Sequence, residues 1–330
     1  MHFRNLDEEK LVQHLTKLFP SKNNILGIGD DSAVIPRENE KVWLVTTDAL
    51  VEGVHFLKDQ IPANDLGYKV VAVNVSDIVA MGGKPKYGFL SIACPKTVKF
   101  FWVHRIIEGI KKACDKWNIL FLGGDTVGSK RDVFVNFTII GSAVRNKVKY
   151  RNNAKLGDII CVNGYLGNSG AGLKALQEKV KKTKHIQHLI RSHFHPEPSL
   201  SQGMWLASHK EVHAMMDISD GLDSDLKKLI KKSEKGAVIE INLIPISNSL
   251  SKISIKEGWD SLQFALVGGE DYCLLFTVAS DAFEKLQDSF KKTFNCSLFP
   301  IGKIDNHINE VTYHKNGKKI QLNYLQYNHF

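Results

Sequence analysis

Acidic residues follow apolar runs at five places along the chain, and this repetition is the strongest chemical signal in the sequence. The five places are Asp30-Asp31, Asp48, Asp125, 217–220 and Glu270-Asp271. We interpret each apolar run as a strand, so the acids stand at strand ends, where a single aspartate is usually a turn residue or a helix cap. If several of these ends converge, the carboxylates repel one another unless cations neutralise them. Hard oxygen ligands select Mg²⁺ or Ca²⁺, so the pattern predicts a divalent-metal site.

A further aspartate, Asp77, lies inside an apolar segment, VVAVNVSDIVAM, that is typical of a buried helix. An unpaired carboxylate on a buried face is costly. The side chain is therefore either a cap or the partner of a lysine, or a metal ligand that faces the acid cluster. We favour the metal ligand.

Glycines adjoin the acids in GIGDD, GGDT and GGED. A residue without a side chain lets backbone N–H groups approach an anion closely, so these pairs predict a phosphate bound together with Mg²⁺. The sequence has no GxxxxGK[ST] motif and no HRD, DFG or VAIK set, which excludes P-loop NTPases and the protein-kinase pattern. The looser glycine run over 164–172 is by itself typical of a strand-to-helix turn.

Serine and histidine chemistry finds little support. The segment GNSGAG around Ser169 lacks the GxSxG spacing of a hydrolase, and no HExxH motif occurs. Four histidines crowd a basic region, where we expect them on a solvated face: His185, His188, His193 and His195. His55 directly follows an acid-bearing strand, and it is either an ordinary loop histidine or part of the site.

The elements that position these residues are expected to mix strands and helices. A first helix is expected over 7–19, followed by strands over 28–36, 41–51, 87–95, 119–126 and 133–144. A long buried helix is expected to start with Asp65 as its N-cap and to end at Gly82-Gly83, and another helix covers 99–117. The composition turns basic near 149–158, before further strands at 158–164, 237–246 and 264–278. The sequence therefore predicts a mixed α/β (α+β) fold in two domains, 1–148 and 149–330.

Composition agrees with a folded protein of two domains. The chain has 330 residues, of which 43% are hydrophobic and 24% charged, which excludes a disordered or fibrous protein. The five cysteines form no CxxC pair, so we expect a reducing, cytoplasmic location. No apolar window is long enough for a membrane span. The net charge of +9 gathers on expected helix faces without stacking aromatics, so it indicates a basic surface and anionic substrates rather than nucleic acid.

Seven motifs in a fixed order give the chain a family resemblance. They are GIGDDSAVI, TTDALVEGVHF, VNVSDIVAMGGKP, GGDT, DISDGLDSDL, GGEDYCLLF and the terminal YNHF. In this order they resemble the thiamine-monophosphate kinase family of the aminoimidazole-ribotide synthetase-like superfamily. The resemblance implies a two-domain fold whose first domains pair in a homodimer. It also implies phosphorylation of thiamine phosphate to thiamine diphosphate by ATP, through in-line transfer assisted by several Mg²⁺ ions.

The resemblance assigns roles to residues that match the motifs. The magnesium ligands it implies are Asp31, Thr46, Thr47, Asp48, Asp77, Asp125, Asp217 and Asp220, with the adjacent Asp30 as a further candidate. The ATP contacts it implies are Gly124, Asp125, Arg151 and Ser219, and the contacts to thiamine phosphate are His55, Glu270 and Tyr327. The chain departs from the family pattern at Asn152-Asn153, Val267, Cys273 and Ser199, positions that affect phosphate contacts around the site rather than the metal ligands.

Two other functions remain open from the sequence. One is a different ATP-dependent superfamily member that acts on another phosphate or on a carboxylate. The other is a protein that binds thiamine phosphate without turnover. No protein base is required in the kinase reaction, because the acceptor phosphate is already ionised at neutral pH. The absence of an obvious nucleophile is therefore compatible with catalysis.

Overall fold

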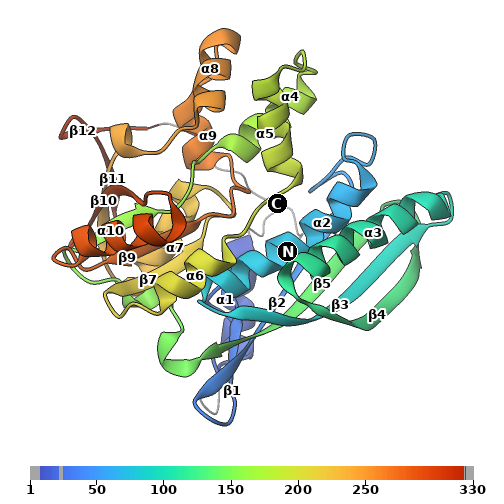
Figure 1. The fold of residues 1–330 in the computed structure, drawn as a ribbon, viewed down its shortest axis with the longest axis horizontal. Helices are drawn as coiled ribbons and strands as arrows, with labels where there is room; N and C mark the ends of the chain where they lie inside the picture. The colour runs from blue at the N-terminus through green and yellow to red at the C-terminus, as the bar shows by residue number, and fades with distance from the viewer. Residues whose placement is uncertain (1–7, 22–24, 323, 325–330) are drawn as a thin grey trace.

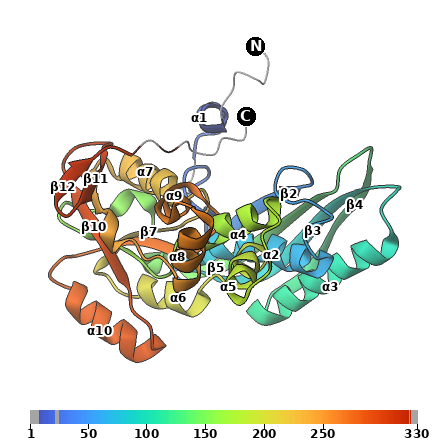
Figure 2. The same ribbon diagram turned by 90° about the horizontal axis from the view of Figure 1, so that it is seen from above.

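Two sheets, each built from one half of the chain, lie side by side in the computed structural model (Figure 1). The structure describes residues 8–21, 25–322 and 324. Seen from above, the helix α2 lies between the sheet of the first half and the elements of the second half (Figure 2). No helix in these described ranges is long and apolar enough to cross a membrane.

The first half forms a five-stranded sheet in the order β1-β2-β5-β3-β4. Neighbouring strands are antiparallel except β3 and β4, which the helix α3 connects and which run parallel. The bounds of its elements are α1 Glu8–Leu18, β1 Ala33–Pro36, β2 Lys41–Val51, α2 Ala63–Ala80, β3 Lys84–Pro95, α3 Phe100–Trp117, β4 Leu120–Ser129 and β5 Phe134–Val144.

The second half forms a seven-stranded sheet in the order β12-β11-β8-β10-β6-β9-β7. Its strands are β6 Ile159–Val162, β7 Val212–Asp217, β8 Gly236–Glu240, β9 Leu274–Val278, β10 Phe299–Asp305, β11 Val311–Lys315 and β12 Lys318–Ile320. Its helices are α4 Asn168–Gln177, α5 Lys184–Phe194, α6 Leu200–Ala207, α7 Leu222–Ser233, α8 Asn248–Glu257, α9 Ser261–Val267 and α10 Phe283–Phe294. Short 3₁₀ turns lie at Arg145–Lys147, Arg151–Asn153 and Ile241–Leu243.

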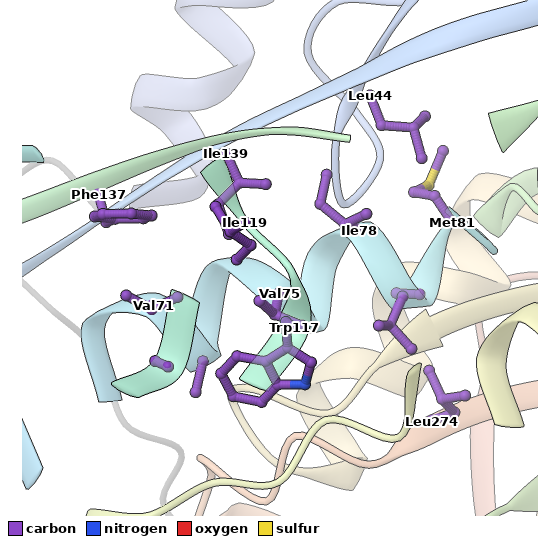
Figure 3. Close-up of a cluster of buried hydrophobic side chains, with 14 of the residues drawn as sticks. Leu44, Val71, Val75, Ile78, Met81, Trp117, Ile119, Phe137, Ile139 and Leu274 are labelled. Atoms are coloured by element: carbon purple, nitrogen blue, oxygen red, sulfur yellow. The ribbon is translucent and has the colours of Figure 1, made fainter. Parts of the chain in front are cut away.

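Helix α2 is the buried centre of the molecule, as its all-round apolar sequence predicts. Every residue from Leu66 to Ala80 is buried except Asp77. The helix packs on β2 and β5 of its own sheet, and its other sides contact α3, α6 and β7. Figure 3 shows Val75 and Ile78 of this helix among side chains from the first sheet, with Leu274 of the second half close by.

The close approach of α2 and α3 depends on two glycines. A Cβ atom on Gly67 would lie 1.9 Å from the carbonyl oxygen of Ile106, and one on Gly109 would lie 2.0 Å from the carbonyl oxygen of Asn64. Each helix therefore touches the backbone of the other directly. This contact leaves no room for a methyl group on either side.

The expectation that acids stand at five strand ends is wrong in most places. Only Asp217 ends a strand. Asp48 and Asp125 lie inside β2 and β4, because strand pairing continues past both residues. Asp30-Asp31 precede β1, and Glu270-Asp271 follow the helix α9. A short apolar run such as FALV does not distinguish a strand from a helix, so tertiary packing decided these cases.

Asp65 also differs from the prediction, because it does not cap α2. The helix begins at Ala63 directly after Pro62 and has no side-chain cap hydrogen bond. Proline is well suited to a helix start because it has no N–H to satisfy. Asp65 is instead paired with the ring of His195, whose Nε2 lies 2.7 Å from its Oδ1.

The glycine contact gives a stability prediction. We expect Gly109→Ala to lower the free energy of unfolding by roughly 1–3 kcal/mol, because overpacking forces α2 and α3 apart. Helix propensity alone predicts the opposite, a gain of up to about 1 kcal/mol. Urea unfolding followed by circular dichroism decides between them. Gly128→Ala is the control, since a Cβ there meets nothing within 4 Å, and an equal effect of both substitutions would contradict the packing argument.

Candidate active site

Three aspartates from distant parts of the chain meet in a largely buried cluster, in which Asp31 and Asp217 are buried and Asp77 is half-buried. Asp31 comes from the loop before β1, Asp77 from α2 and Asp217 from the end of β7. One carboxylate oxygen of each lies within 4.8 Å of the others. Asp31 and Asp217 are 8% and 2% exposed, so water screens their charges poorly. Asp77 therefore faces the acid cluster, and its favoured role as a metal ligand stays a prediction.

Hydroxyl and guanidinium donors hold these carboxylates in place. Thr46 Oγ1 donates to Asp77, and Ser76 Oγ donates to Asp217 Oδ2 at 2.6 Å. The guanidinium of Arg151 donates to Asp31 Oδ1 at 2.5 Å. Two neutral donors and one cation for three carboxylates leave the cluster with an excess of negative charge.

The pKa values reflect this crowding. Burial, and then the charges of Asp48, Asp217 and Asp31, raise the pKa of Asp77 well above its usual value. Burial and the charge of Asp31 likewise raise the pKa of Asp217. The cluster therefore either binds protons or needs a cation. Its ligands are all oxygens, which fits a hard divalent ion such as Mg²⁺ better than a softer metal.

Asp48 and Asp220 extend the acidic surface beside this cluster. Burial and the charge of Asp220 raise the pKa of Asp48 to about 6. The backbone N–H of Asp48 donates to Asn74 Oδ1 on α2 at 3.0 Å, which fixes the strand against the helix. Asp220 is paired with the ammonium of Lys228 on α7.

Asp225 is a residue of the site that the sequence analysis did not identify. Its Oδ2 accepts the backbone N–H groups of Ser219 and Asp220, each at 2.9 Å. This fully buried carboxylate therefore shapes the loop that follows Asp217 and carries Asp220. Its place in the first turn of α7, directly after the DISDG motif, is the signal that could have identified it.

Asp30 contacts the backbone of Arg151, whereas Asp31 contacts its guanidinium. The backbone N–H of Arg151 donates to Asp30 Oδ1 at 2.9 Å. Burial and the charge of Asp31 raise the pKa of Asp30 to about 6. Arg151, expected as an ATP contact, is thus directly connected to two of the expected metal ligands.

Two expected metal ligands lie on the opposite face of the first sheet. Successive residues of a strand point to opposite faces, so Thr47 faces away from Thr46 and α2. Its Oγ1 lies 2.9 Å from Thr138 Oγ1 on β5. Residues paired across neighbouring strands point to the same face of a sheet. Asp125 is paired with Ser91, and Ser91 is paired with Asn136, whose side chain donates to Thr47 Oγ1. Asp125 therefore lies on the same face as Thr47. The structure therefore does not bring Asp125 together with Asp77.

Asp125 is also distant along the sheet. Strand β4 lies three strand spacings from β2, which is about 14 Å at the usual spacing of neighbouring strands. Gly124 beside it has a structural role in this chain, because a Cβ there would lie 1.7 Å from the carbonyl oxygen of Leu90. Both residues are exposed on the edge strand β4.

Glu270 lies in a separate polar group at the junction of the two halves. Its carboxylate is paired with Lys69 of α2, at 2.8 Å, and with Nδ1 of His193 of α5, at 3.0 Å. Burial opposes its ionisation, but Lys69 and His193 outweigh burial and hold the pKa of Glu270 below its usual range. The expected solvated position is wrong for His193 and for His195, since their side chains are only 7% and 11% exposed. The basic sequence around His193 concealed a buried face of an amphipathic helix.

The same group is not a hydrolytic triad. Ser169 Oγ lies 3.1 Å from His193 Nδ1, the ring nitrogen that also faces Glu270. A serine–histidine–carboxylate relay needs its two partners on different ring nitrogens. The expectation from the missing GxSxG spacing therefore agrees with the geometry.

The two other residues expected to contact thiamine phosphate are His55 and Tyr327. His55 lies in the turn after β2, where its Nδ1 accepts the backbone N–H of Val51 at 3.1 Å. Tyr327 lies outside the described residues.

Comparison with known proteins identifies the family. The family models "AIR synthase related protein, N-terminal domain" and "AIR synthase related protein, C-terminal domain" match residues 29–143 and 155–314. A thiamine-monophosphate kinase of Buchnera aphidicola subsp. Schizaphis graminum is 40% identical over 313 residues, which is 94% of each chain. This chain belongs to the thiamine-monophosphate kinase family.

Solved structures of this family have the same fold. The structure "AaThiL complexed with AMPPCP and TMP" has a TM-score of 0.87 and 33% identity, and the match covers 100% of this chain and 99% of that one. Thiamine monophosphate kinase from Aquifex aeolicus has a TM-score of 0.82 and 32% identity, with 97% and 99% covered. The expected two-part α/β fold is thereby confirmed.

The acid cluster predicts a pH-dependent effect of Mg²⁺ on stability. Because Asp48 has its pKa raised from 3.8 to about 6, the metal-free protein should lose stability as the pH rises between these values. Mg²⁺ should therefore raise the melting temperature more at pH 7.5 than at pH 5, where protons compete for the same oxygens. Asp77→Asn should raise the melting temperature of the metal-free protein at pH 7.5 and remove most of the Mg²⁺ effect.

Asp158→Asn is the matched control for this measurement. Asp158 is 3% exposed and is paired with His213 rather than with other acids. Its substitution should lower the melting temperature and leave the Mg²⁺ effect unchanged. A metal-free Asp77→Asn protein that is less stable than wild type would contradict the proposed repulsion.

Proposed function

We propose that the protein transfers the γ-phosphoryl group of ATP to thiamine phosphate, producing thiamine diphosphate and ADP. In this reaction an oxygen of the acceptor phosphate forms a bond to the γ-phosphorus while the bond to the β–γ bridging oxygen breaks. The observation that carries the proposal is the buried cluster of Asp31, Asp77 and Asp217 in a chain of this family. Its excess negative charge suits a site where cations and two phosphates meet.

The carboxylates of the cluster would hold Mg²⁺, together with Asp48, Asp220 and the neighbouring Asp30. Bound Mg²⁺ would offset the mutual repulsion of the two phosphates. Arg151 would orient the nucleotide from its position beside Asp31. Ser219, the other expected ATP contact, donates its backbone N–H to Asp225, which fixes its position. None of these groups has to remove a proton, because the acceptor oxygen is already ionised.

The acceptor would be bound by His55, Glu270 and Tyr327. Glu270 supports this assignment, since Lys69 and His193 hold its pKa below the usual range although it is half-buried. Thiamine carries a positive charge on its thiazolium ring and an amino group on its pyrimidine, and a carboxylate can contact either.

The metal assignment predicts the effect of Asp48→Asn. We expect kcat to fall at least about a hundredfold, which corresponds to about 2.7 kcal/mol of transition-state stabilisation, while the melting temperature does not fall. Asp288→Asn, an exposed aspartate on α10, is the control. Product chromatography after incubation with ATP, Mg²⁺ and thiamine phosphate measures the turnover.

The same assay tests the two other functions. A binding protein would give no product with wild type. A different superfamily member would phosphorylate another acceptor in a panel of phosphates and carboxylates faster than thiamine phosphate. Either result would contradict the proposal.

We further propose a homodimer in which the first sheets of two copies pair, with the boundary between the halves at 148/149. The edge strand β4 supports this, because Leu120, Phe121 and Val127 are 60%, 48% and 52% exposed. An exposed apolar edge strand is a ready surface for another strand or chain. Since Asp125 lies on this edge and far from Asp48, the partner's copy of Asp125 would complete the site. A cytoplasmic location is proposed because all five cysteines are free thiols.

This composite site predicts complementation between two inactive variants. Asp48→Asn and Asp125→Asn proteins, each unable to turn over substrate, should recover about a quarter of wild-type activity after equal mixing and subunit exchange. Half of the dimers are then mixed, and each mixed dimer has one intact site of two. No recovery, with mixed dimers confirmed by mass spectrometry, would place both aspartates in the same subunit's site.

A further inference from the structure

The Glu270 carboxylate is almost fully occupied by its neighbours. An ionised carboxylate has about four lone-pair positions on its two oxygens. The Lys69 ammonium lies 2.8 Å from Oε1 and 2.9 Å from Oε2, and His193 Nδ1 lies 3.0 Å from Oε2. Three positions are thus taken, and the remaining one is on Oε1.

The two neighbours, Lys69 and His193, are more deeply buried than the Glu270 carboxylate that they contact. The side chains of Lys69 and His193 are 0% and 7% exposed, whereas that of Glu270 is 26% exposed. Lys69 comes from the first half of the chain and His193 from the second. The carboxylate is therefore fixed by both halves, with its accessible side left for a ligand.

The backbone of Glu270 is fixed as well. Glu270 and Tyr272 adopt left-handed φ values of 57° and 49°, which residues with a side chain rarely do. Their N–H groups donate to the carbonyl oxygens of Ser219 and Ile218, at 2.6 and 2.8 Å. The surrounding structure must hold such a conformation, and here the loop between Asp217 and Asp220 holds it.

We propose that Lys69 and His193 are positioning residues that leave Glu270 with a single acceptor, on Oε1, for the amino group of the pyrimidine of thiamine phosphate. This inference rests on the proposed function. The charge of Lys69 cancels that of Glu270, so a directed hydrogen bond suits the pair better than attraction of the thiazolium charge. Specificity then follows from a half-buried acceptor that a substrate without this amino group would cover and leave unpaired.

Two kinds of substrate test the proposal: thiamine phosphate and an analogue that lacks the pyrimidine amino group. The wild-type ratio of kcat/KM for the two should be at least about tenfold. Lys69→Met should reduce this ratio to within about threefold and raise the KM for thiamine phosphate, with the KM for ATP within about twofold of wild type. A wild-type ratio near one would overturn the assignment of the amino group.

The pH profile separates positioning from a merely structural role. Without the Lys69 ammonium, burial should raise the pKa of Glu270, so the carboxyl group is protonated at the acidic end of the assay range. In Lys69→Met, kcat/KM for thiamine phosphate should therefore rise with pH relative to wild type. The other titratable groups near Glu270 are His193, Asp271 and Tyr272, and they are the same in both proteins.

His193 provides a second pair of variants in case Lys69→Met does not fold. His193→Asn keeps an N–H donor close to the position of Nδ1 and should keep the substrate ratio, whereas His193→Leu should reduce it. Lys149→Met is the matched control, because Lys149 is a buried lysine that donates to the carbonyl oxygens of His209 and Val212. It should lower the melting temperature without changing the ratio.

The outcomes distinguish this inference from the proposed function. If wild type phosphorylates thiamine phosphate but Lys69→Met and His193→Leu keep its substrate ratio, the positioning role is wrong and the function stands. If wild type does not phosphorylate thiamine phosphate, the proposed function itself fails.

Discussion

Mutual repulsion among buried carboxylates is the constraint on which the rest of this structure depends. Asp31, Asp77 and Asp217 lie close together where water screens them poorly, and in the described part of the chain only the guanidinium of Arg151 is paired with this cluster. A protein interior tolerates such a group only if cations or protons complete it. The fold holds this arrangement with the hydroxyl groups of Thr46 and Ser76, which orient the oxygens of Asp77 and Asp217 without cancelling their charge.

Helix α2 positions the side chains of the acid cluster. It is buried on nearly all sides, so its buried polar side chains must find partners in other elements. Asn74 contacts β2, Ser76 contacts the end of β7, and Lys69 contacts the segment before β9. The same helix thus joins the two halves of the chain and positions both the acid cluster and Glu270. Packing defects near α2 should therefore affect stability and activity together.

The first sheet divides the expected metal ligands between its two faces. Strand alternation sends Thr46 and Thr47 in opposite directions, and the register of β3 and β4 places Asp125 on the outer face at an exposed edge. Ligands on opposite faces of one sheet do not meet in a single metal site within one subunit. This distribution is consistent with the proposal that a second copy covers the apolar edge and supplies the missing carboxylate.

The sequence by itself determined the residue types of the site and the burial of α2. An aspartate inside an all-apolar helix has few tolerable environments, so Asp77 could be expected to be a cap, the partner of a lysine or a metal ligand. Glycines beside acids indicated phosphate chemistry from local composition and spacing, which the sequence contains directly. The order of the motifs indicated it through the resemblance to a family.

Only the tertiary structure decided which residues meet. The partners Lys69 and Glu270 are 201 residues apart, and no local pattern distinguishes a lysine that pairs across two halves from one on the surface. His193 looked solvated because its neighbours in sequence are basic, yet one face of its helix is buried. The strand positions of Asp48 and Asp125 were fixed by pairing with β5 and β3, since hydrogen bonding between strands extends past residues that propensity would place in turns.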